Sequence, residues 1–396
     1  MKKSILAVIL ILSLFSACTQ NSEAVVVPST ETATQTAVTV NTTNTHEIDS
    51  NILEFTAANP EITVTKAGNY VVTGSTTNGR LVINAGDEAV TLTLQDVSIE
   101  SETGSAIRVR SAGSVEIILP EQSNSVLISS VRDDDNSEAI SSNSDLTISG
   151  GGGLTLTSNG NGIHSDRTFT MNGGTVMINR AEEGIEAATI NITGGSIAIT
   201  AFEDGINVSD GAYNADSYNQ SGGRVYINAA GDGLDSNNEI NITGGTLIIE
   251  GPTARDNAAI DYDRAFNIDG GTVIAVGSRG MNVYPTSGTQ TFIGANIAAN
   301  AGDTVIARDA AGNEIAAIVL SKKVENVFIS TSALVKGETV NIYVSEDSGE
   351  RFAQTAVAGE APQIGFQGST FGDGQPPQFP FGFDDDRFDD DDRYDD

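Results

Sequence analysis

The sequence contains no tryptophan and a single cysteine, Cys18. One cysteine can form neither an internal disulfide nor a thiolate metal site. Without tryptophan, the protein also lacks the side chain that would stack best on a flat surface such as crystalline cellulose. Any ligand must therefore be recognised by other groups.

Basic residues are scarce as well. Lys and Arg number 20 against 53 for Asp and Glu, which gives a formal net charge of −33 at pH 7. This charge rules against binding to nucleic acid and against electrostatic docking on anionic lipid. Cations are the expected partners, and an acidic protein that binds an acidic polymer needs them as bridges.

The amino terminus has the pattern of an export signal. Two lysines precede an uncharged apolar run over 5–15, which is too short to span a bilayer as a permanent helix. The LFSAC segment that follows ends at Cys18 and resembles a bacterial lipobox, although Phe15 stands where Leu is usual. An incidental cysteine after an ordinary secretory signal is the alternative. We expect a lipoprotein signal peptide over 1–17, lipidation of Cys18, a flexible tether over 18–45 and a secreted protein anchored by lipid to the bacterial membrane or cell surface.

The other end of the chain is acidic. Residues 351–396 turn first to Gly, Pro, Gln and Phe and then, from Asp384, to an almost unbroken run of aspartate. Like charges repel and little apolar surface is available to bury, so this segment is predicted to be a disordered tail.

A repeated sequence pattern, called the phrase below, occupies the chain between the amino-terminal segment and the acidic tail. An alternating apolar pair, a Gly-Gly, a second alternating pair, an acidic residue or Asn, and then Gly-Ile recur from about Ala89 to Met281. The period is roughly 22 residues, with two longer insertions. The Gly-Gly pairs begin at Gly151, Gly173, Gly194, Gly222, Gly244 and Gly270.

This phrase predicts an all-β solenoid. Period-two alternation makes short strands, glycines permit tight corners, and one such turn cannot bury its own apolar side until turns stack. A leucine-rich repeat of similar length would carry a helix, but the copies lack a 3.6-residue pattern. We expect a parallel β-helix over 46–285 and a small β cap over 286–350 that covers its open end. One internal column is predicted to contain Ile107, Ile140, Ile163, Ile185, Ile206, Leu234, Ile260 and Met281.

Acidic residues recur at the corner of each turn, before the repeated glycine and two residues after it. Stacked in register, their carboxylates face one another and repel unless a divalent cation is bound, and oxygen-only ligands suit calcium. The alternative is that Asp-Gly and Asn-Gly simply form turns at a solvated corner. The predicted metal ligands are Glu183, Glu186, Asp204, Asp232, Asp235 and Asp261.

The two insertions are the candidate ligand-binding segments, because insertions in solenoids often emerge on one face. Tyrosine rings can stack on a sugar, and arginine can pair with the carboxylate of a uronic acid. Loops without a function are the alternative for each insertion. The candidate ligand-binding residues are Tyr213, Tyr218, Arg255, Tyr262 and Arg264.

Several runs carry a family resemblance: NGIHSDRTFTMNGGTVMI, EDGINVSD, GDGLDSNNEINITGGTLII and AGDTVIARDAAGN. Over about 45–345 they resemble a bacterial carbohydrate-binding parallel β-helix family that binds cellulose and acidic sugars and is similar in fold to the family nine pectate lyases. The resemblance implies a right-handed β-helix with calcium at Asp204, Asp232 and Asp235, and also at Glu183 and Glu186. Asn161 and the segment 186–188 depart from the family pattern.

Binding and catalysis remain alternatives. A polysaccharide lyase of similar fold uses a lysine base beside calcium, but lysine occurs only at 2, 3, 66, 322, 323 and 336, outside the acidic turns. An arginine base at Arg167, Arg180, Arg255 or Arg264 is a demanding choice because of its high pKa, and a hydrolase would need paired carboxylates. We therefore predict no catalytic residues and expect calcium-dependent binding of an extracellular acidic or cellulose-type polysaccharide. A lyase or hydrolase is the second hypothesis and a structural adhesin the third; contact with a membrane is expected only through the lipid anchor.

Overall fold

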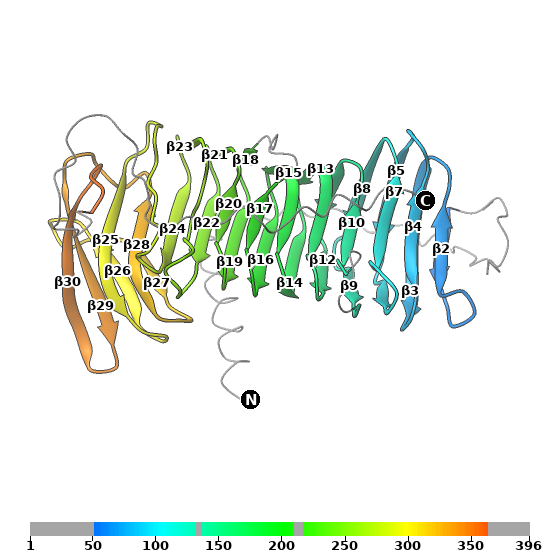
Figure 1. Ribbon diagram of the computed structural model, residues 1–396, viewed down its shortest axis with the longest axis horizontal. Coiled ribbons are helices and arrows are strands. Elements are labelled where there is room, and N and C mark those ends of the chain that lie inside the picture. The colour runs from blue at the N-terminus through cyan, green and yellow to red at the C-terminus, as the bar shows by residue number, and fades with distance from the viewer. Residues whose placement is uncertain (1–50, 132–136, 210–216, 363–396) are drawn as a thin grey trace, which may run out of the picture. The chain divides into compact units, whose positions relative to one another are not determined.

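The computed structural model describes residues 51–131, 137–209 and 217–362, and these contain thirty strands and no helix. Twenty-six strands form one sheet, and the remaining four form a second sheet near the carboxyl end. The large sheet is parallel except where β28 joins it. The protein is thus all-β and solenoid-like, with strands stacked side by side (Figure 1). No helix in these ranges is long and apolar enough to cross a membrane.

The strand bounds follow the alternation in the sequence. The first turns contain β1 (Ile52–Phe55), β2 (Glu61–Val64), β3 (Gly68–Thr76), β4 (Arg80–Asn84), β5 (Ala89–Leu94), β6 (Ser98–Ser101), β7 (Ile107–Ser111), β8 (Ser114–Leu119) and β9 (Asn124–Ser129). The next contain β10 (Ile140–Ser142), β11 (Leu146–Gly150), β12 (Gly153–Thr157), β13 (Ile163–Met171), β14 (Thr175–Ala181), β15 (Ile185–Ile192), β16 (Ser196–Ala201), β17 (Ile206–Val208) and β18 (Ser217–Gln220). The last contain β19 (Arg224–Ala229), β20 (Leu234–Ser236), β21 (Glu239–Ile242), β22 (Thr246–Glu250), β23 (Ala265–Ile268) and β24 (Thr272–Gly277).

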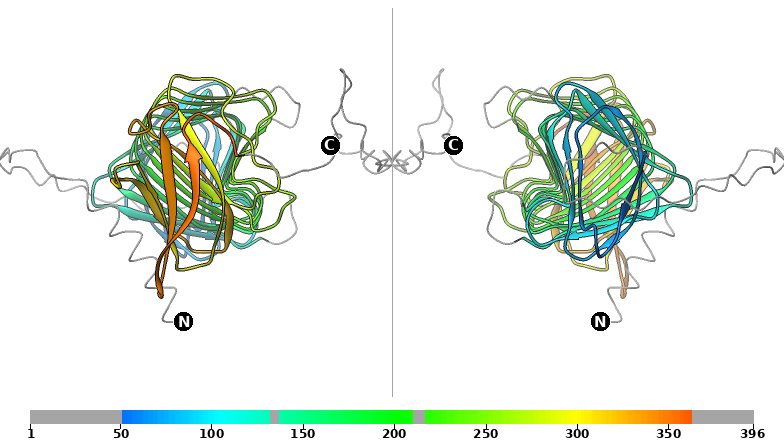
Figure 2. Two further views of the ribbon diagram at one scale, coloured as in Figure 1. Left: turned by 90° about the vertical axis from the view of Figure 1, so that its left-hand side faces the viewer. Right: turned by 90° about the vertical axis from the view of Figure 1, so that its right-hand side faces the viewer.

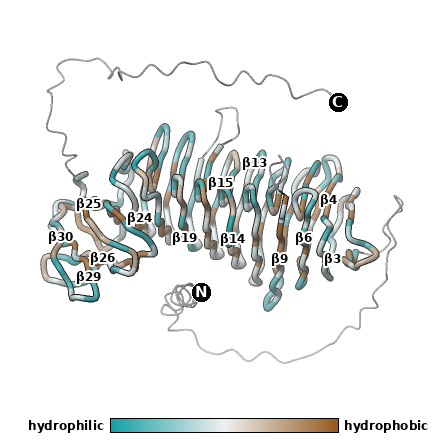
Figure 3. Tube along the Cα trace, turned by 60° about the horizontal axis from the view of Figure 1, so that its bottom comes forward, coloured by the Kyte–Doolittle hydropathy of each residue, from teal (hydrophilic) through white to brown (hydrophobic). Residues whose placement is uncertain are grey.

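Each turn buries one side of its strands. In β19 the side chains alternate between half-buried and buried, and polar and apolar segments alternate along the turns in Figure 3. Viewed along the stack, successive turns superpose (Figure 2). The Gly-Gly corners permit this close stacking: a Cβ on Gly222 would lie 2.2 Å from the carbonyl oxygen of Thr193 in the preceding turn, and Gly223 has a φ of 65°.

The predicted apolar column is confirmed from β7 to Ile260. Parallel pairing places each residue of this column opposite its counterpart in the next turn, in the order Ile107, Ile140, Ile163, Ile185, Ile206, Leu234 and Ile260. Placing Met281 in this column is wrong, since its side chain is 48% exposed. The chain has left the stack there, because β24 ends at Gly277 and pairs on its outer side with β28.

A cap follows the last turn. Its strands are β25 (Phe292–Ala299), β26 (Thr304–Arg308), β27 (Glu314–Val319), β28 (Val324–Ser330), β29 (Thr339–Glu346) and β30 (Gly349–Val357). β28 pairs antiparallel with both β24 and β25, and the other four strands form an antiparallel sheet over a second apolar core. The predicted start of the disordered tail at 351 is therefore wrong, because 351–357 belong to β30. Residues 363–396 of that tail, and the predicted signal, tether and Cys18, lie outside the described residues.

Buried polar groups attach the cap to the stack. Glu250, which is 2% exposed, accepts hydrogen bonds from Tyr226 Oη at 2.6 Å and from the backbone N–H and Oγ of Ser321 at 2.7 and 2.9 Å. Beside it, Lys322 Nζ donates to the carbonyl oxygen of Ala229 at 2.5 Å. A buried carboxylate with three donors is fully compensated, so this contact holds the cap in one position.

Candidate functional site

The acidic positions form a continuous column at one corner of the turns. Parallel pairing aligns His164 with Glu186, Glu186 with Asn207, and Asn207 with Asp235. The register predicted from the Gly-Ile repeat is therefore observed. Because adjacent strands in a sheet lie about 4.8 Å apart, aligned side chains in this column are close enough to interact.

Three of the six predicted metal ligands come together. Asp204 precedes β17, Asp232 precedes β20, and Asp235 lies within β20. Each offers a carboxylate oxygen, and the three oxygens lie within 4.8 Å of one another. All three side chains are half-buried. Among the described residues, no basic side chain contributes to the pKa shifts of these three carboxylates.

The pKa values of the three clustered aspartates are all raised, which means that their charged forms are destabilised in this arrangement. Burial, together with the smaller effects of the charges of Asp204, Asp261 and Asp235, raises the pKa of Asp232 to about 7, although the backbone hydrogen bond from Ala258 lowers it. Burial and the charge of Asp261 likewise raise the pKa of Asp235 to about 6. The pKa of Asp204 is also raised, mainly by burial. A divalent cation would favour the charged forms and remove this penalty.

The same carboxylates also have a structural role that the sequence reasoning missed. Asp204 Oδ1 accepts the backbone N–H of Asp232 at 2.6 Å, and Asp232 Oδ1 accepts that of Ala258 at 2.5 Å. Each acid thus bonds to the corresponding residue of the next turn. Among the described residues, Oδ2 of Asp204 and of Asp232 forms no hydrogen bond, so one oxygen of each is available to a ligand.

The two predicted glutamate ligands lie further along the column and outside the aspartate cluster. Burial and the charge of Glu186 raise the pKa of Glu183 to about 8. Glu183 Oε1 accepts a hydrogen bond from Asn207 Nδ2 at 3.0 Å, while its Oε2 is buried without a partner among the described residues. Glu186 Oε2 accepts from Asn161 Nδ2 at 2.6 Å and lies 3.7 Å from His164 Nε2. Glu186 is therefore already partnered by protein groups.

The last predicted ligand, Asp261, borders the cluster. Its Oδ1 accepts the backbone N–H of Tyr262 at 2.8 Å. Its charge raises the pKa of Asp204, Asp232 and Asp235, and its own pKa is raised by burial. It adds a fourth negative charge beside the three clustered carboxylates.

Of the two predicted ligand-binding tyrosines in the first insertion, one is buried and the other lies outside the described residues. Assigning Tyr218 to sugar stacking is wrong, because its ring is fully buried. Strand pairing places Tyr218 opposite Ile190 and Ile240 in a second apolar row, and its Oη donates to Gln220 Oε1 at 2.9 Å. The insertion ends before it, and β18 returns it to the core. Tyr213 lies outside the described residues.

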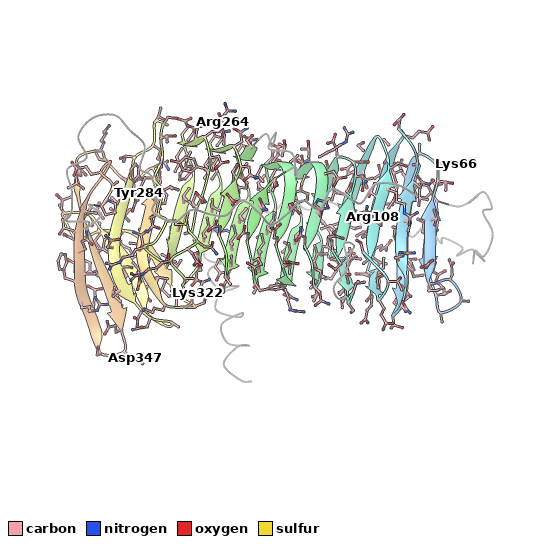
Figure 4. The ribbon with its side chains drawn as sticks, viewed as in Figure 1. Lys66, Arg108, Arg264, Tyr284, Lys322 and Asp347 are labelled. Atoms are coloured by element: carbon pink, nitrogen blue, oxygen red, sulfur yellow. The ribbon has the colours of Figure 1, made fainter. Side chains whose placement is uncertain are left out.

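The second insertion places its residues near the cap. Arg255 donates through Nε and Nη2 to Glu325 Oε2, at 3.1 and 2.9 Å. Tyr262 is half-buried and donates through Oη to the carbonyl oxygen of Tyr284 at 2.9 Å. Arg264 is exposed at the edge of the stack (Figure 4), and its guanidinium has no partner among the described residues. Of this group, Arg264 is therefore the one positioned to meet an external anion.

Lys322 was expected to lie outside the acidic turns, and the fold brings it to the strand that precedes one of them. It belongs to the cap but reaches the end of β19, where Ala229 lies three residues before Asp232. Burial lowers the pKa of Lys322 to about 8, although the negative charge of Glu250 acts to raise it. A contact between residues so far apart along the chain leaves no sign in the local pattern.

Fold and site together define an all-β, solenoid-like protein with an acidic column at one corner. Residues 58–348 match the family described as carbohydrate-binding domain-containing protein. The chain belongs to this family.

Two relatives are similar over parts of the chain. A carbohydrate-binding domain-containing protein of Acetivibrio thermocellus is 30% identical over 122 residues, which are 28% of this chain and 43% of that protein. The chain thus spans less than half the length of that relative. The structure of the polysaccharide lyase-like protein from C. thermocellum, a gadolinium derivative, has 26% sequence identity and a TM-score of 0.47, and the match covers 54% of this chain and 89% of that chain.

Proposed function

We propose that this protein is a surface-anchored carbohydrate-binding protein, built as a right-handed parallel β-helix, that recognises an acidic polysaccharide through calcium held at Asp204, Asp232 and Asp235. Membership of a carbohydrate-binding family supports the ligand class. The observation that carries the proposal is the cluster of three carboxylate oxygens within 4.8 Å of one another.

The chemistry of this cluster fits calcium. Calcium takes six to eight oxygen ligands at roughly 2.3–2.6 Å, so two oxygens on one ion can be up to about 5 Å apart. The clustered oxygens meet this limit. Carboxylates without nitrogen or sulfur donors disfavour zinc and copper. Because three protein ligands leave positions unfilled, water and an external carboxylate are the expected additional ligands.

The charge of the chain explains why calcium would be needed for binding. Protein and polyuronate are both anionic, and their direct contact is repulsive. A calcium ion shared between Asp232 and a uronate carboxylate reverses that repulsion. Arg264, exposed and near Asp261 along the chain, is the basic side chain expected to assist.

Surface anchoring is part of the same proposal. It rests on the export signal and on Cys18 at the end of the LFSAC segment. A lipid at this cysteine, followed by the tether over 18–45, would hold the β-helix away from the membrane while it contacts extracellular polymer.

The metal half of this proposal is tested by calorimetric titration of the purified protein with calcium. We expect binding in the native protein and loss of it in Asp204→Asn/Asp232→Asn. The matched control is Asp145→Asn, because Asp145 also accepts a backbone N–H from another turn, that of Thr168 at 3.1 Å, but lies outside the cluster. Equal calcium binding by all three proteins would show that calcium does not bind at this cluster.

A calcium-dependent lyase is the second candidate function, and Lys322 is the observation that favours it. Burial lowers the pKa of this lysine to about 8, into the range of a general base. Its Nζ is engaged by Ala229, however, and its pKa responds to Glu250 and to none of the clustered aspartates. Growth of absorbance at about 235 nm during incubation with polygalacturonate, lost in Lys322→Gln, would establish the lyase, since proton abstraction beside the carboxyl gives a conjugated uronate.

A further inference from the structure

A groove lies where the last turn of the stack meets the cap, away from the acidic column. Its volume is about 620 Å³, and its walls come from Asp269, the connector 285–292, the turn 331–336 and Gly359. Small-molecule sites commonly measure roughly 300–1,000 Å³. The strands that flank the groove, β24, β25 and β28, lie together in Figure 1.

The connector wall is held in place by the last turn. Asp269 Oδ1 accepts hydrogen bonds from the backbone N–H and Oγ1 of Thr289 at 2.8 and 2.9 Å. Gln290 Nε2 donates to Gly271 O at 3.1 Å and to Ser330 Oγ at 2.9 Å. A Cβ at Gly288, where φ is 116°, would lie 2.1 Å from the carbonyl oxygen of Ile268. The groove is therefore formed before any ligand arrives.

The opposite wall carries an unpaired positive charge. Lys336 is exposed, and its ammonium forms no hydrogen bond or ion pair within the described ranges. Its stem lies against Gly359, where an added Cβ would meet Lys336 Cγ at 3.2 Å. Other basic side chains of the cap are paired: Lys323 with Glu325, Arg308 with Glu350 and Arg351 with Glu346. An unpaired cation in a chain of net charge −33 is available to an external anion.

The remaining lining suits a sugar ring. Hydroxyl and amide groups supply donors and acceptors, while half-buried Phe292, buried Leu334 and exposed Val335 supply apolar surface for the C–H face of a pyranose. Phe292 is itself fixed by stacking on Tyr284 and on Phe328, each with ring centroids 5.6 Å apart. Figure 4 places Tyr284 at this end of the stack.

We infer that this groove is a second carbohydrate site, which binds a short hexuronate segment without calcium by pairing a uronate carboxylate with Lys336. The inference rests on the proposed carbohydrate-binding function but uses none of the acidic residues of the column. A single exposed ammonium gives weak binding, so the groove adds to the retention of a polymer and does not replace the calcium contact.

Titration calorimetry with trigalacturonate in excess chelator tests the inference. The native protein should bind it and should bind its methyl-esterified form about 1.4- to fivefold more weakly, the effect of an exposed ion pair of roughly 0.2–1 kcal/mol. Lys336→Gln should bind both forms equally weakly. Ser332→Tyr should abolish binding by filling the groove from its exposed rim. The matched control Lys323→Gln should bind as the native protein does.

The outcomes separate the two sites. Unchanged binding in Lys336→Gln and Ser332→Tyr, or no binding of trigalacturonate in chelator, overturns the groove even if calcium-dependent polymer binding persists. Binding that survives in Asp204→Asn/Asp232→Asn and is lost in Ser332→Tyr supports the groove, even if the calcium proposal fails.

Discussion

Asp204 Oδ1 accepts the backbone N–H of Asp232, the corresponding residue of the next turn, at 2.6 Å. Asp232 repeats this contact with Ala258. Each acid therefore holds two turns together through Oδ1 and also contributes its carboxylate to a cluster of negative charge. The stacking contact needs an acceptor oxygen and the proposed metal site needs negative charge, so substitutions that keep one and remove the other can separate the two roles.

Replacing Asp232 by Asn or Ala separates the two roles. Asn keeps the Oδ1 that accepts from Ala258 and removes the charge, so in chelator at about pH 8 Asp232→Asn should melt at or above the native temperature. Ala removes the acceptor as well and leaves a buried N–H unsatisfied, at a cost of about 1–3 kcal/mol. Thermal melts in chelator measure both. A melting temperature for Asp232→Asn as low as that for Asp232→Ala would show that charge repulsion is unimportant.

Stability in chelator should fall as the pH rises from about 4 to about 8. The pKa of Asp232 rises from 3.8 to about 7 on folding, and that of Glu183 rises from 4.5 to about 8. A raised folded-state pKa means that protonation favours the folded state, so the stabilisation is complete below the unfolded pKa and is lost through the folded one. The difference in melting temperature between native protein and Asp232→Asn isolates this effect from other titrations. A difference that does not change with pH would contradict it.

Calcium should restore the stability that the native protein loses in chelator as the pH rises. An ion that binds only the folded state raises the melting temperature with its concentration. At about pH 8 the native protein should gain several degrees, since roughly 1 kcal/mol shifts the melting temperature of a domain of about 150–250 residues by 2–4 °C. Asp204→Asn/Asp232→Asn should show little gain, and Asp145→Asn should match the native protein. Identical melts of native protein with calcium and with chelator would exclude the site.

The lipid anchor gives an independent prediction. Cys18→Ser should release the protein from membranes into the medium and abolish fatty-acid labelling, because acylation needs the cysteine sulfur. Fractionation of cells followed by immunoblotting measures this. Unchanged membrane association and labelling in the variant would show that the LFSAC segment is not a lipobox.

Much of the fold could be predicted because the repeat is local. Alternation, Gly-Gly corners and the Gly-Ile phrase are enough to align Ile185 with Ile206 and Glu186 with Asn207 from the sequence alone. Tyr218 was misplaced because it stands beside an insertion, and the sequence does not mark where the insertion ends and β18 begins. Met281 was misplaced because the repeat ends where pairing with β28 begins, and that pairing joins segments about 50 residues apart.

The site could be predicted only in part for the same reason. The clustering of Asp204, Asp232 and Asp235 follows from the repeat, but their hydrogen bonds to the next turn depend on the backbone geometry of the corner. The groove at Lys336 and the approach of Lys322 to Ala229 join the cap to the stack across long stretches of sequence. No periodic pattern encodes contacts of that kind.

Calcium bridging is tested most directly by retention of the native protein on immobilised polygalacturonate, measured with calcium and with chelator beside Asp204→Asn/Asp232→Asn and the control Asp145→Asn. Because protein and polymer are both anionic, the account predicts retention at least about tenfold higher with calcium for the native protein and for Asp145→Asn, a difference of roughly 1.4 kcal/mol. The double variant should remain at the chelator level in both conditions. Equal retention of the native protein with calcium and with chelator, or full calcium-dependent retention of the double variant, would contradict the account.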